Sequence, residues 1–260
     1  MSGVCISSCA LSLYSLFSFS RVMKYIVLAG LGALLMGLGA CHKEDAEPSQ
    51  PEYADWYALR APEGRAIQAV YGDLDETLVI STRFAIYQTK DRGKTWLPSD
   101  YKDRFGVEGF LQRGDTLPAM TAATGAAAPN SIAYAISPTS YSLDKGATWQ
   151  KYVWRGRYNL EPKAVLNRVT SPAGIAYEME YRLTPTQPGS TSNYVETIGI
   201  QNALGAHLSL PKDHDITSIY FDAKSRLYAT ASAALCGRGE NFAFCGEQNG
   251  VLYVSNKPQP

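Results

Sequence analysis

The sequence contains few of the residues that build catalytic and metal centres. Its 260 residues include three histidines, and no two of them lie at the spacing that zinc ligands require. A phosphate-binding glycine loop and a nucleophile elbow are also missing. These absences exclude the enzyme classes that such motifs define, and we expect no cofactor and no metal site.

An excess of one charge is absent as well. The chain has 24 basic and 24 acidic residues. Arg21 and Lys24 precede Cys41 and no acidic residue does, so the chain from Cys41 onward has slightly more acidic than basic groups. Because such a balance does not attract a polyanion, nucleic acid is not an expected partner.

A sustained 3.6-residue apolar period is absent from the chain after Cys41. Short runs rich in Tyr, Ile, Val and Thr occur instead, separated by Gly, Pro, Asp and Asn. They include residues 66–71, 77–81, 131–136, 216–221 and 226–230. Many short strands with closely spaced turn signals predict an all-β sandwich, barrel or propeller.

The beginning of the chain has the layout of an export signal. Met23 and Lys24 precede an apolar run that ends at Ala40 and is shorter than the about 20 residues of a membrane helix. We expect translation to start at Met23, although a long leader or a second membrane segment before it is the alternative.

The end of this apolar run carries a second signal. Leu38-Gly39-Ala40-Cys41 resembles the lipobox of bacterial lipoproteins, in which the cysteine thiol takes a diacylglycerol and the chain is cut just before it. The resemblance implies that residues 1–40 are removed and that Cys41 anchors the protein in a lipid bilayer. An ordinary signal peptide or an uncleaved anchor that ends near a cysteine is the alternative.

A polar, proline-containing tether follows over residues 41–52. Its Lys43-Glu44-Asp45 resembles the signal that sends some lipoproteins to the outer face of the bacterial outer membrane. We therefore expect a lipid-anchored protein of the outer membrane, exposed either at the cell surface or at the periplasmic face.

Two cysteines remain after Cys41, and they enclose a glycine-bearing loop from Cys236 to Cys245. A secreted domain folds in an oxidising compartment, and two cysteines without nearby histidines make a poor metal site. We therefore expect a disulfide between Cys236 and Cys245.

An internal repeat narrows the choice among all-β folds. Residues 89–96 and 142–149 share the pattern Ser/Thr-x-Asp-x-Gly-x-Thr-Trp. The aspartate can accept hydrogen bonds from backbone N–H groups of a turn, the first hydroxyl adds another local bond, the glycine permits a positive φ, and the tryptophan packs on the core. The residues to which we assign these structural roles are Thr89, Asp91, Gly93, Thr95, Trp96, Ser142, Asp144, Gly146, Thr148 and Trp149.

Both copies resemble the Asp box, or BNR repeat, of sialidases and many other β-propellers. The resemblance implies a blade-like unit of about 40 to 50 residues around each copy. We expect residues 53–260 to form a small propeller-like array of about four blades, over residues 66–98, 107–152, 163–211 and 216–258. Residues 55–59 would supply the outer strand of the fourth unit, unless the domain is an open β-structure that merely contains two such hairpins.

Because the repeats resemble those of sialidases, the sequence has to be checked for the catalytic residues of that family. Leu59-Arg60-Ala61-Pro62 is only a partial match to the arginine motif of that family, because it lacks the aromatic residue and the isoleucine. In residues 177–181, strand alternation places both glutamates on the face opposite the tyrosines. The chain is also too short for the about six blades that build a sialidase arginine cluster, so we assign no catalytic residue.

Binding is the remaining function. We assign candidate binding roles to Arg60, Trp154, Arg155, Arg157 and Tyr158, because aromatic rings beside guanidinium groups stack on sugars or on protein surfaces. Residues 212–215 could bind a cation, but a polar turn is the better explanation of them. The sequence predicts a non-catalytic cell-envelope lipoprotein that binds an unknown glycan or protein, and the alternative is a sialidase-like glycoside hydrolase.

Overall fold

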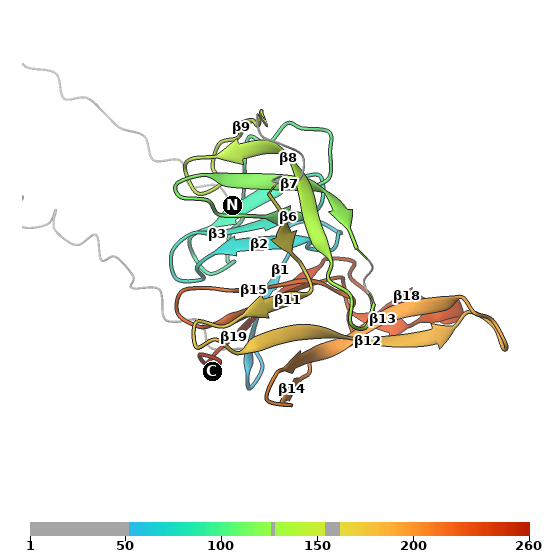
Figure 1. The fold of residues 1–260 in the computed structure, drawn as a ribbon. Coiled ribbons are helices and arrows are strands. Elements are labelled where there is room, and N and C mark those ends of the chain that lie inside the picture. The colour runs from blue at the N-terminus through green and yellow to red at the C-terminus, as the bar shows by residue number, and fades with distance from the viewer. Residues whose placement is uncertain (1–51, 126–127, 154–161) are drawn as a thin grey trace, which may run out of the picture. The chain divides into compact units, whose positions relative to one another are not determined.

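The computed structural model describes residues 52–125, 128–153 and 162–260 (Figure 1). All of them belong to the second of the two compact units of the chain, Ser49–Pro260. Within these ranges no helix has the length and apolarity needed to cross a bilayer.

Four antiparallel sheets make up most of this unit, and we number them as blades 1 to 4 in chain order. Blade 1 has the order β2 (Ala69–Gly72), β3 (Leu78–Ser81), β4 (Ile86–Thr89) and β5 (Leu97–Pro98). Blade 2 has β6 (Gly109–Phe110), β7 (Leu117–Thr124), β8 (Tyr134–Ser142) and β9 (Gln150–Lys151), and β10 (Ala164–Val165) also pairs with β8.

Blade 3 has the order β11 (Arg168–Thr170), β12 (Ala176–Pro185), β13 (Asn193–Asn202) and β14 (His207–Leu208). Blade 4 has β15 (Ile216–Phe221), β16 (Leu227–Ala231), β19 (Val251–Ser255) and β1 (Trp56–Arg60). Between β16 and β19 the chain inserts a hairpin of β17 (Leu235–Gly237) and β18 (Ala243–Phe244), joined through the 3₁₀ turn η3 (Gly239–Asn241).

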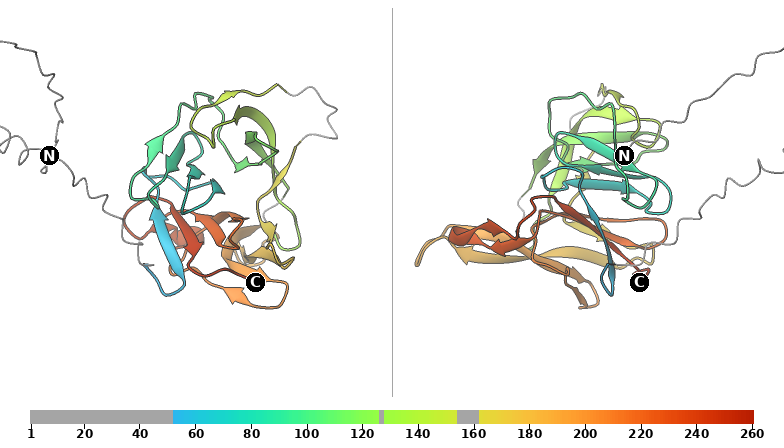
Figure 2. Two further views of the ribbon diagram at one scale, coloured as in Figure 1. Left: turned by 90° about the vertical axis from the view of Figure 1, so that its left-hand side faces the viewer. Right: turned by 180° about the vertical axis from the view of Figure 1, so that it is seen from behind.

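The N-terminal strand completes the last blade. Strand β1 pairs antiparallel with β19, from Trp56 opposite Ser255 to Arg60 opposite Val251. The pairing removes an unpaired edge from β19, which is the reason a propeller takes one strand from its other terminus. The predicted all-β fold of about four propeller-like blades with an N-terminal closing strand is confirmed, and Figure 2 (left) shows the sheets around a common centre.

The apolar core lies between neighbouring blades. One cluster joins blades 4 and 1, a second joins blades 3 and 4, and a third joins blades 1 and 2. Their buried members include Leu78, Ile80, Tyr228, Leu252 and Val254 in the first, Tyr177, Ile200, Ile219 and Phe221 in the second, and Val79, Ile86, Val107 and Ala119 in the third. Strands of neighbouring blades therefore bury side chains against each other, as a face-to-face packing of sheets requires.

Blades 2 and 3 meet through a polar contact. The buried Asn167 accepts a hydrogen bond from Ala133 N at 2.9 Å and donates one to Ser131 O at 2.8 Å. Its backbone carbonyl oxygen accepts from Met179 N of β12 at 3.0 Å. One asparagine thus satisfies backbone groups of both blades at this junction.

Candidate functional site

The two sequence repeats form the turns between β4 and β5 and between β8 and β9. In the first turn, Asp91 Oδ1 accepts from Thr95 N at 2.9 Å, and Oδ2 accepts from Thr95 Oγ1 at 2.5 Å. Thr89 Oγ1 accepts from Gly93 N at 2.9 Å, and Gly93 has a φ of 79°. The aspartate carboxylate is therefore occupied within its own turn.

The second turn repeats this arrangement. Asp144 Oδ1 accepts from Thr148 N at 2.9 Å, Oδ2 accepts from Thr148 Oγ1 at 2.6 Å, and Ser142 Oγ accepts from Gly146 N at 2.7 Å. Partial burial raises the pKa of Asp144, but the hydrogen bonds from Thr148 and Ser142 outweigh it and lower the pKa overall. A carboxylate held in this way stabilises the turn, because both of its oxygens accept hydrogen bonds from residues of that turn.

Blade 3 lacks the repeat but has an equivalent that the sequence analysis missed. Asn202, at the end of β13, accepts from Leu204 N at 3.0 Å and from Ala206 N at 2.9 Å. A side-chain amide oxygen thus replaces the carboxylate. The signal was an asparagine three residues before a glycine, Gly205, which has a φ of 84°.

The candidate binding residue Arg60 lies at the end of β1 with its side chain exposed. It forms ion pairs with Glu247 at 2.9 Å and Glu52 at 3.9 Å, and it lines a cavity of about 190 Å³ with His214 and Tyr253. Trp154, Arg155, Arg157 and Tyr158 lie outside the described residues.

The structure does not bring Arg60 together with Arg182. Arg182 lines a different cavity and pairs with Glu196 at 2.8 Å. In strand β12 the glutamates also have partners, since Glu178 pairs with Arg168 and Glu180 with His207. Arg60, Arg182, Glu178 and Glu180 therefore each have a different partner within the chain.

Residues 212–215 belong to the irregular segment between β14 and β15, and His214 is buried there. Its Nδ1 lies 2.9 Å from Ser232 O, and its Nε2 lies 2.8 Å from Tyr253 Oη. Burial lowers the pKa of His214 and keeps the ring neutral. No group of three metal-ligating side chains occurs within residues 52–125, 128–153 and 162–260.

The most prominent surface feature is an extension of blade 3. Strands β12 and β13 each have ten residues, longer than the usual five or six. Their outer neighbours are short, because β11 pairs only with residues 176–178 and β14 only with residues 200–201. The remaining halves, Tyr181–Pro185 and Asn193–Thr197, project from the blade, and we call them the arm (Figure 1).

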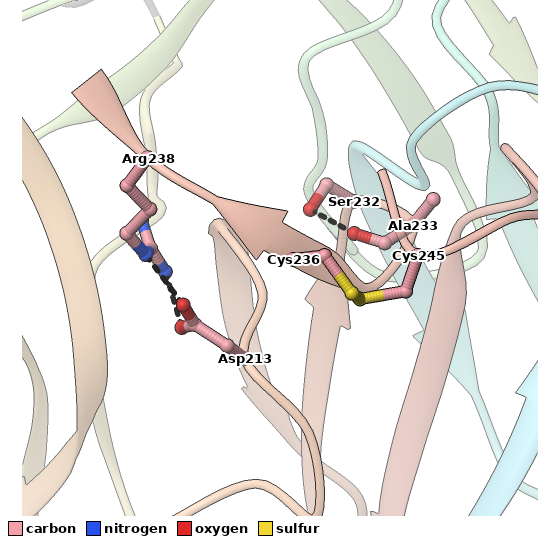
Figure 3. Close-up of a disulfide and its surroundings, with 6 residues drawn as sticks. All are labelled: Asp213, Ser232, Ala233, Cys236, Arg238 and Cys245. Atoms are coloured by element: carbon pink, nitrogen blue, oxygen red, sulfur yellow. Dashed lines mark hydrogen bonds and ion pairs between the residues drawn. A yellow bond between two sulfur atoms is a disulfide. The ribbon is translucent and has the colours of Figure 1, made fainter. Parts of the chain in front are cut away.

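The disulfide hairpin supports the base of the arm. Cys236 and Cys245 are bonded, as predicted, which closes the hairpin of β17 and β18 (Figure 3). Beside the disulfide, Arg238 donates to Asp213 through two nitrogens, at 2.6 and 2.7 Å, and to Asp215 at 2.6 Å. The same guanidinium donates to Thr197 O of the arm at 3.1 Å.

This guanidinium therefore joins three segments: the hairpin, the entry to blade 4 and the arm. Hydrogen bonds from Arg238 lower the pKa of Asp213, so the aspartate is ionised at neutral pH. The planar fork of an arginine suits such bidentate contacts. A two-stranded ribbon alone is marginally stable in water, and this support gives the arm a defined direction.

Apolar side chains are exposed on this extension. Leu183 and Val195 are cross-strand partners and are 46% and 47% exposed. Phe242 on the supporting hairpin is 55% exposed and packs edge-on against Phe244, with 5.1 Å between ring centres. The sequence analysis missed these residues. The available signal was the length of the strand-forming segment 176–185, which exceeds the usual five or six residues of a strand.

Comparison with known proteins gives a distant structural likeness. No protein-family model and no curated protein matches the chain. The structure is similar to YCF48 from Cyanidioschyzon merolae, with 12% identity and a TM-score of 0.35 over 78% of this chain and 86% of that chain. It is also similar to YCF48 bound to D1 peptide, with 13% identity and a TM-score of 0.36 over 82% of this chain and 100% of that one. The fold assignment rests on the strand order described above.

Proposed function

We propose that this chain is a non-catalytic binding or scaffold module of the bacterial cell envelope and that its arm takes a protein partner. The observation that carries the proposal is the arm itself. The arm presents a group of apolar side chains to solvent on a supported extension. Exposed apolar residues that occur singly are normal on protein surfaces, whereas a group of them indicates an interaction site.

The edge of the arm favours a partner segment in extended conformation. Apart from β13, residues 181–185 of β12 pair with no other strand of the described structure. Unpaired backbone groups at such an edge are a template for strand addition, in which main-chain hydrogen bonds give affinity and alternate side chains give specificity. Leu183 and Val195 lie directly across from each other and would provide an apolar contact beside the added strand.

The alternative of a sialidase-like hydrolase gains little support from the described residues. Such an enzyme needs several arginines that converge on the carboxylate of a substrate. Arg60 and Arg182 instead line separate cavities, and each is paired with a glutamate of the same chain. Turnover of a fluorogenic sialoside by the purified protein, above a heat-killed control, would contradict the non-catalytic proposal.

The proposal includes a lipid anchor on Cys41, which lies outside the described residues together with residues 42–51 of the tether. We expect mature protein from the membrane fraction to begin at Cys41 and to carry a diacylglycerol on its thiol. Mass spectrometry of the N-terminal peptide measures both features. An unmodified Cys41 in membrane-fractionated protein would contradict the anchor and, with it, the location at the outer membrane.

Site-specific photocrosslinking tests the arm. A photoreactive phenylalanine at position 195 in the full-length protein should give a discrete crosslinked species in native cells, because the residue would lie at the partner contact. The same probe at Leu97, which is 63% exposed on blade 1, is the matched control and should not give that species.

A second variant shows whether the crosslink depends on the arm surface. Leu183→Asp should abolish the species, because a carboxylate opposite the probe would be desolvated by an apolar partner. The fold should be unaffected, since Leu183 is exposed. An identical product from positions 195 and 97, or a crosslink that survives Leu183→Asp, would rule out the arm as the partner site.

A further inference from the structure

A cleft on blade 2 is separate from the arm and from its proposed partner contact. It lies between the segment that follows β5 and the strands β8 and β9, and its volume is about 570 Å³. This size is within the range of small-molecule sites in proteins. We call it the aromatic cleft, because Phe105, Trp149 and Tyr152 line it.

Trp149 is held in place before any ligand arrives. Its indole N–H donates to Gly146 O at 2.9 Å, and its backbone N donates to Asp100 Oδ1 at 2.8 Å. The ring meets Tyr101 edge-on and stacks on Phe110, with 5.9 Å between ring centres in each case. A ring with these restraints loses little conformational freedom on binding.

Phe105 lines the same cleft from a restrained loop. Tyr101 Oη donates to Phe105 O at 2.9 Å, and Phe105 N donates to Asp103 Oδ1 at 3.4 Å. The side chain is nevertheless 60% exposed. The loop thus holds a large aromatic ring in water at the rim of a cleft, where a ligand with an apolar face would cover it.

The polar groups of the cleft indicate which ligand fits. Asp100, Asp103, Lys102 and Lys151 line it and balance one another in charge. Within the described residues, Asp100 Oδ1 is engaged by Trp149 N and no hydrogen bond engages Oδ2. The ligand should therefore be uncharged and should carry both hydrogen-bond donors and apolar faces.

We propose that the aromatic cleft binds an uncharged saccharide. The C–H face of a pyranose ring stacks on aromatic side chains, and its hydroxyl groups donate to carboxylates and accept from lysines. This site is separate from the arm, so its partner is additional to the protein partner proposed above.

Titration of the full-length protein with neutral oligosaccharides tests the proposal. The panel consists of tetrasaccharides of glucose, mannose, galactose and xylose, beside a sialylated trisaccharide, and the readouts are calorimetry and tryptophan fluorescence. At least one neutral probe should bind, and Phe105→Ala should weaken it at least tenfold.

Phe84→Ala is the matched control, because Phe84 is a 51% exposed phenylalanine on blade 1 outside the cleft. It should leave the affinity within twofold of the unmodified protein. No binding of any neutral probe, binding of the sialylated probe alone, or equal affinity in Phe105→Ala would overturn the proposal. None of these results would affect the crosslink expected at the arm. The saccharide proposal and the protein-partner proposal can therefore be contradicted independently of each other.

Discussion

Replacement of Arg226 by alanine should lower the free energy of unfolding by about 3 to 5 kcal/mol, the usual cost of removing one partner from a buried ion pair. The guanidinium is 9% exposed and forms ion pairs with three carboxylates: Asp222 at 2.7 Å, Asp73 at 2.5 Å and Asp75 at 2.8 Å. The Asp222 side chain is only 1% exposed. Without Arg226 its charge would stay buried with no cation to compensate it.

This network joins blades 4 and 1. Arg226 and Asp222 come from the turn between β15 and β16, whereas Asp73 and Asp75 come from the turn between β2 and β3. Tyr228 Oη donates to Asp222 Oδ2 at 2.8 Å and accepts from Leu74 N at 3.0 Å. The loss of Arg226 should therefore weaken the junction at which the N-terminal strand completes the propeller.

Thermal unfolding measures the effect, which should be a fall in Tm of roughly 10 °C for a domain of this size. Lys224→Ala is the matched control. Lys224 contacts the same two aspartates, at 3.0 Å and 2.9 Å, but its side chain is half exposed, so no measurable change is expected. A Tm for Arg226→Ala equal to that of Lys224→Ala would show that the network does not stabilise the junction.

The network also has a pH signature. Partial burial raises the pKa of Asp75, but hydrogen bonds from Lys224 and Arg92 and the charge of Arg226 lower it from 3.8 to about 2. A depressed carboxyl pKa contributes stability that is present above pH 3.8 and is lost as the pH falls through 2. The unfolding free energy of Arg226→Ala should therefore fall less steeply between pH 4 and pH 2.

Local patterns in the sequence predicted the parts of the fold that depend on neighbouring residues. The two repeats predicted the turns of blades 1 and 2, because each aspartate bonds within four residues of itself. Residues 55–59 were expected to supply the outer strand of the fourth unit, and β1 does so by pairing with β19. The Arg226 network was not predictable, since its partners Asp73 and Asp75 are more than 150 positions away in the chain.

The candidate surfaces were also beyond sequence analysis. The arm depends on where β11 and β14 stop, and the cleft on how the segment of residues 100–105 folds against β8 and β9. A strand pattern gives the length of a strand but not the length of its neighbours.

The two repeat turns do more than close hairpins, because each packs against the preceding blade. A Cβ on Gly93 would lie 2.7 Å from Leu59 of the closing strand β1, and Gln88 of β4 donates to Lys145 O of the second turn at 2.6 Å. The turn conformation thus positions a contact between blades, and its loss should affect stability beyond the hairpin.

Asp91→Ala and Asp144→Ala should each lower the free energy of unfolding by about 1 to 2 kcal/mol. Each substitution removes the acceptor for a backbone N–H and a hydroxyl, and water can reach these surface turns, so the full cost of a buried unsatisfied group does not apply. The double variant should lose roughly 2 to 4 kcal/mol if the two turns act independently.

Urea unfolding of the two single variants and the double variant measures these losses, with Asp115→Ala as the control. Asp115 is an exposed turn aspartate for which the described structure has no hydrogen bond or ion pair, so its loss should not change the free energy of unfolding.

Hydrogen bonds also lower the pKa of Asp91, against partial burial that raises it. The unmodified protein should therefore lose stability as the pH falls below about 4, and the double variant should lose less of it. Variants of Asp91 and Asp144 that unfold at the same urea concentration as Asp115→Ala would show that the repeats are not structural, and a ligand-binding role for their carboxylates would then have to be considered.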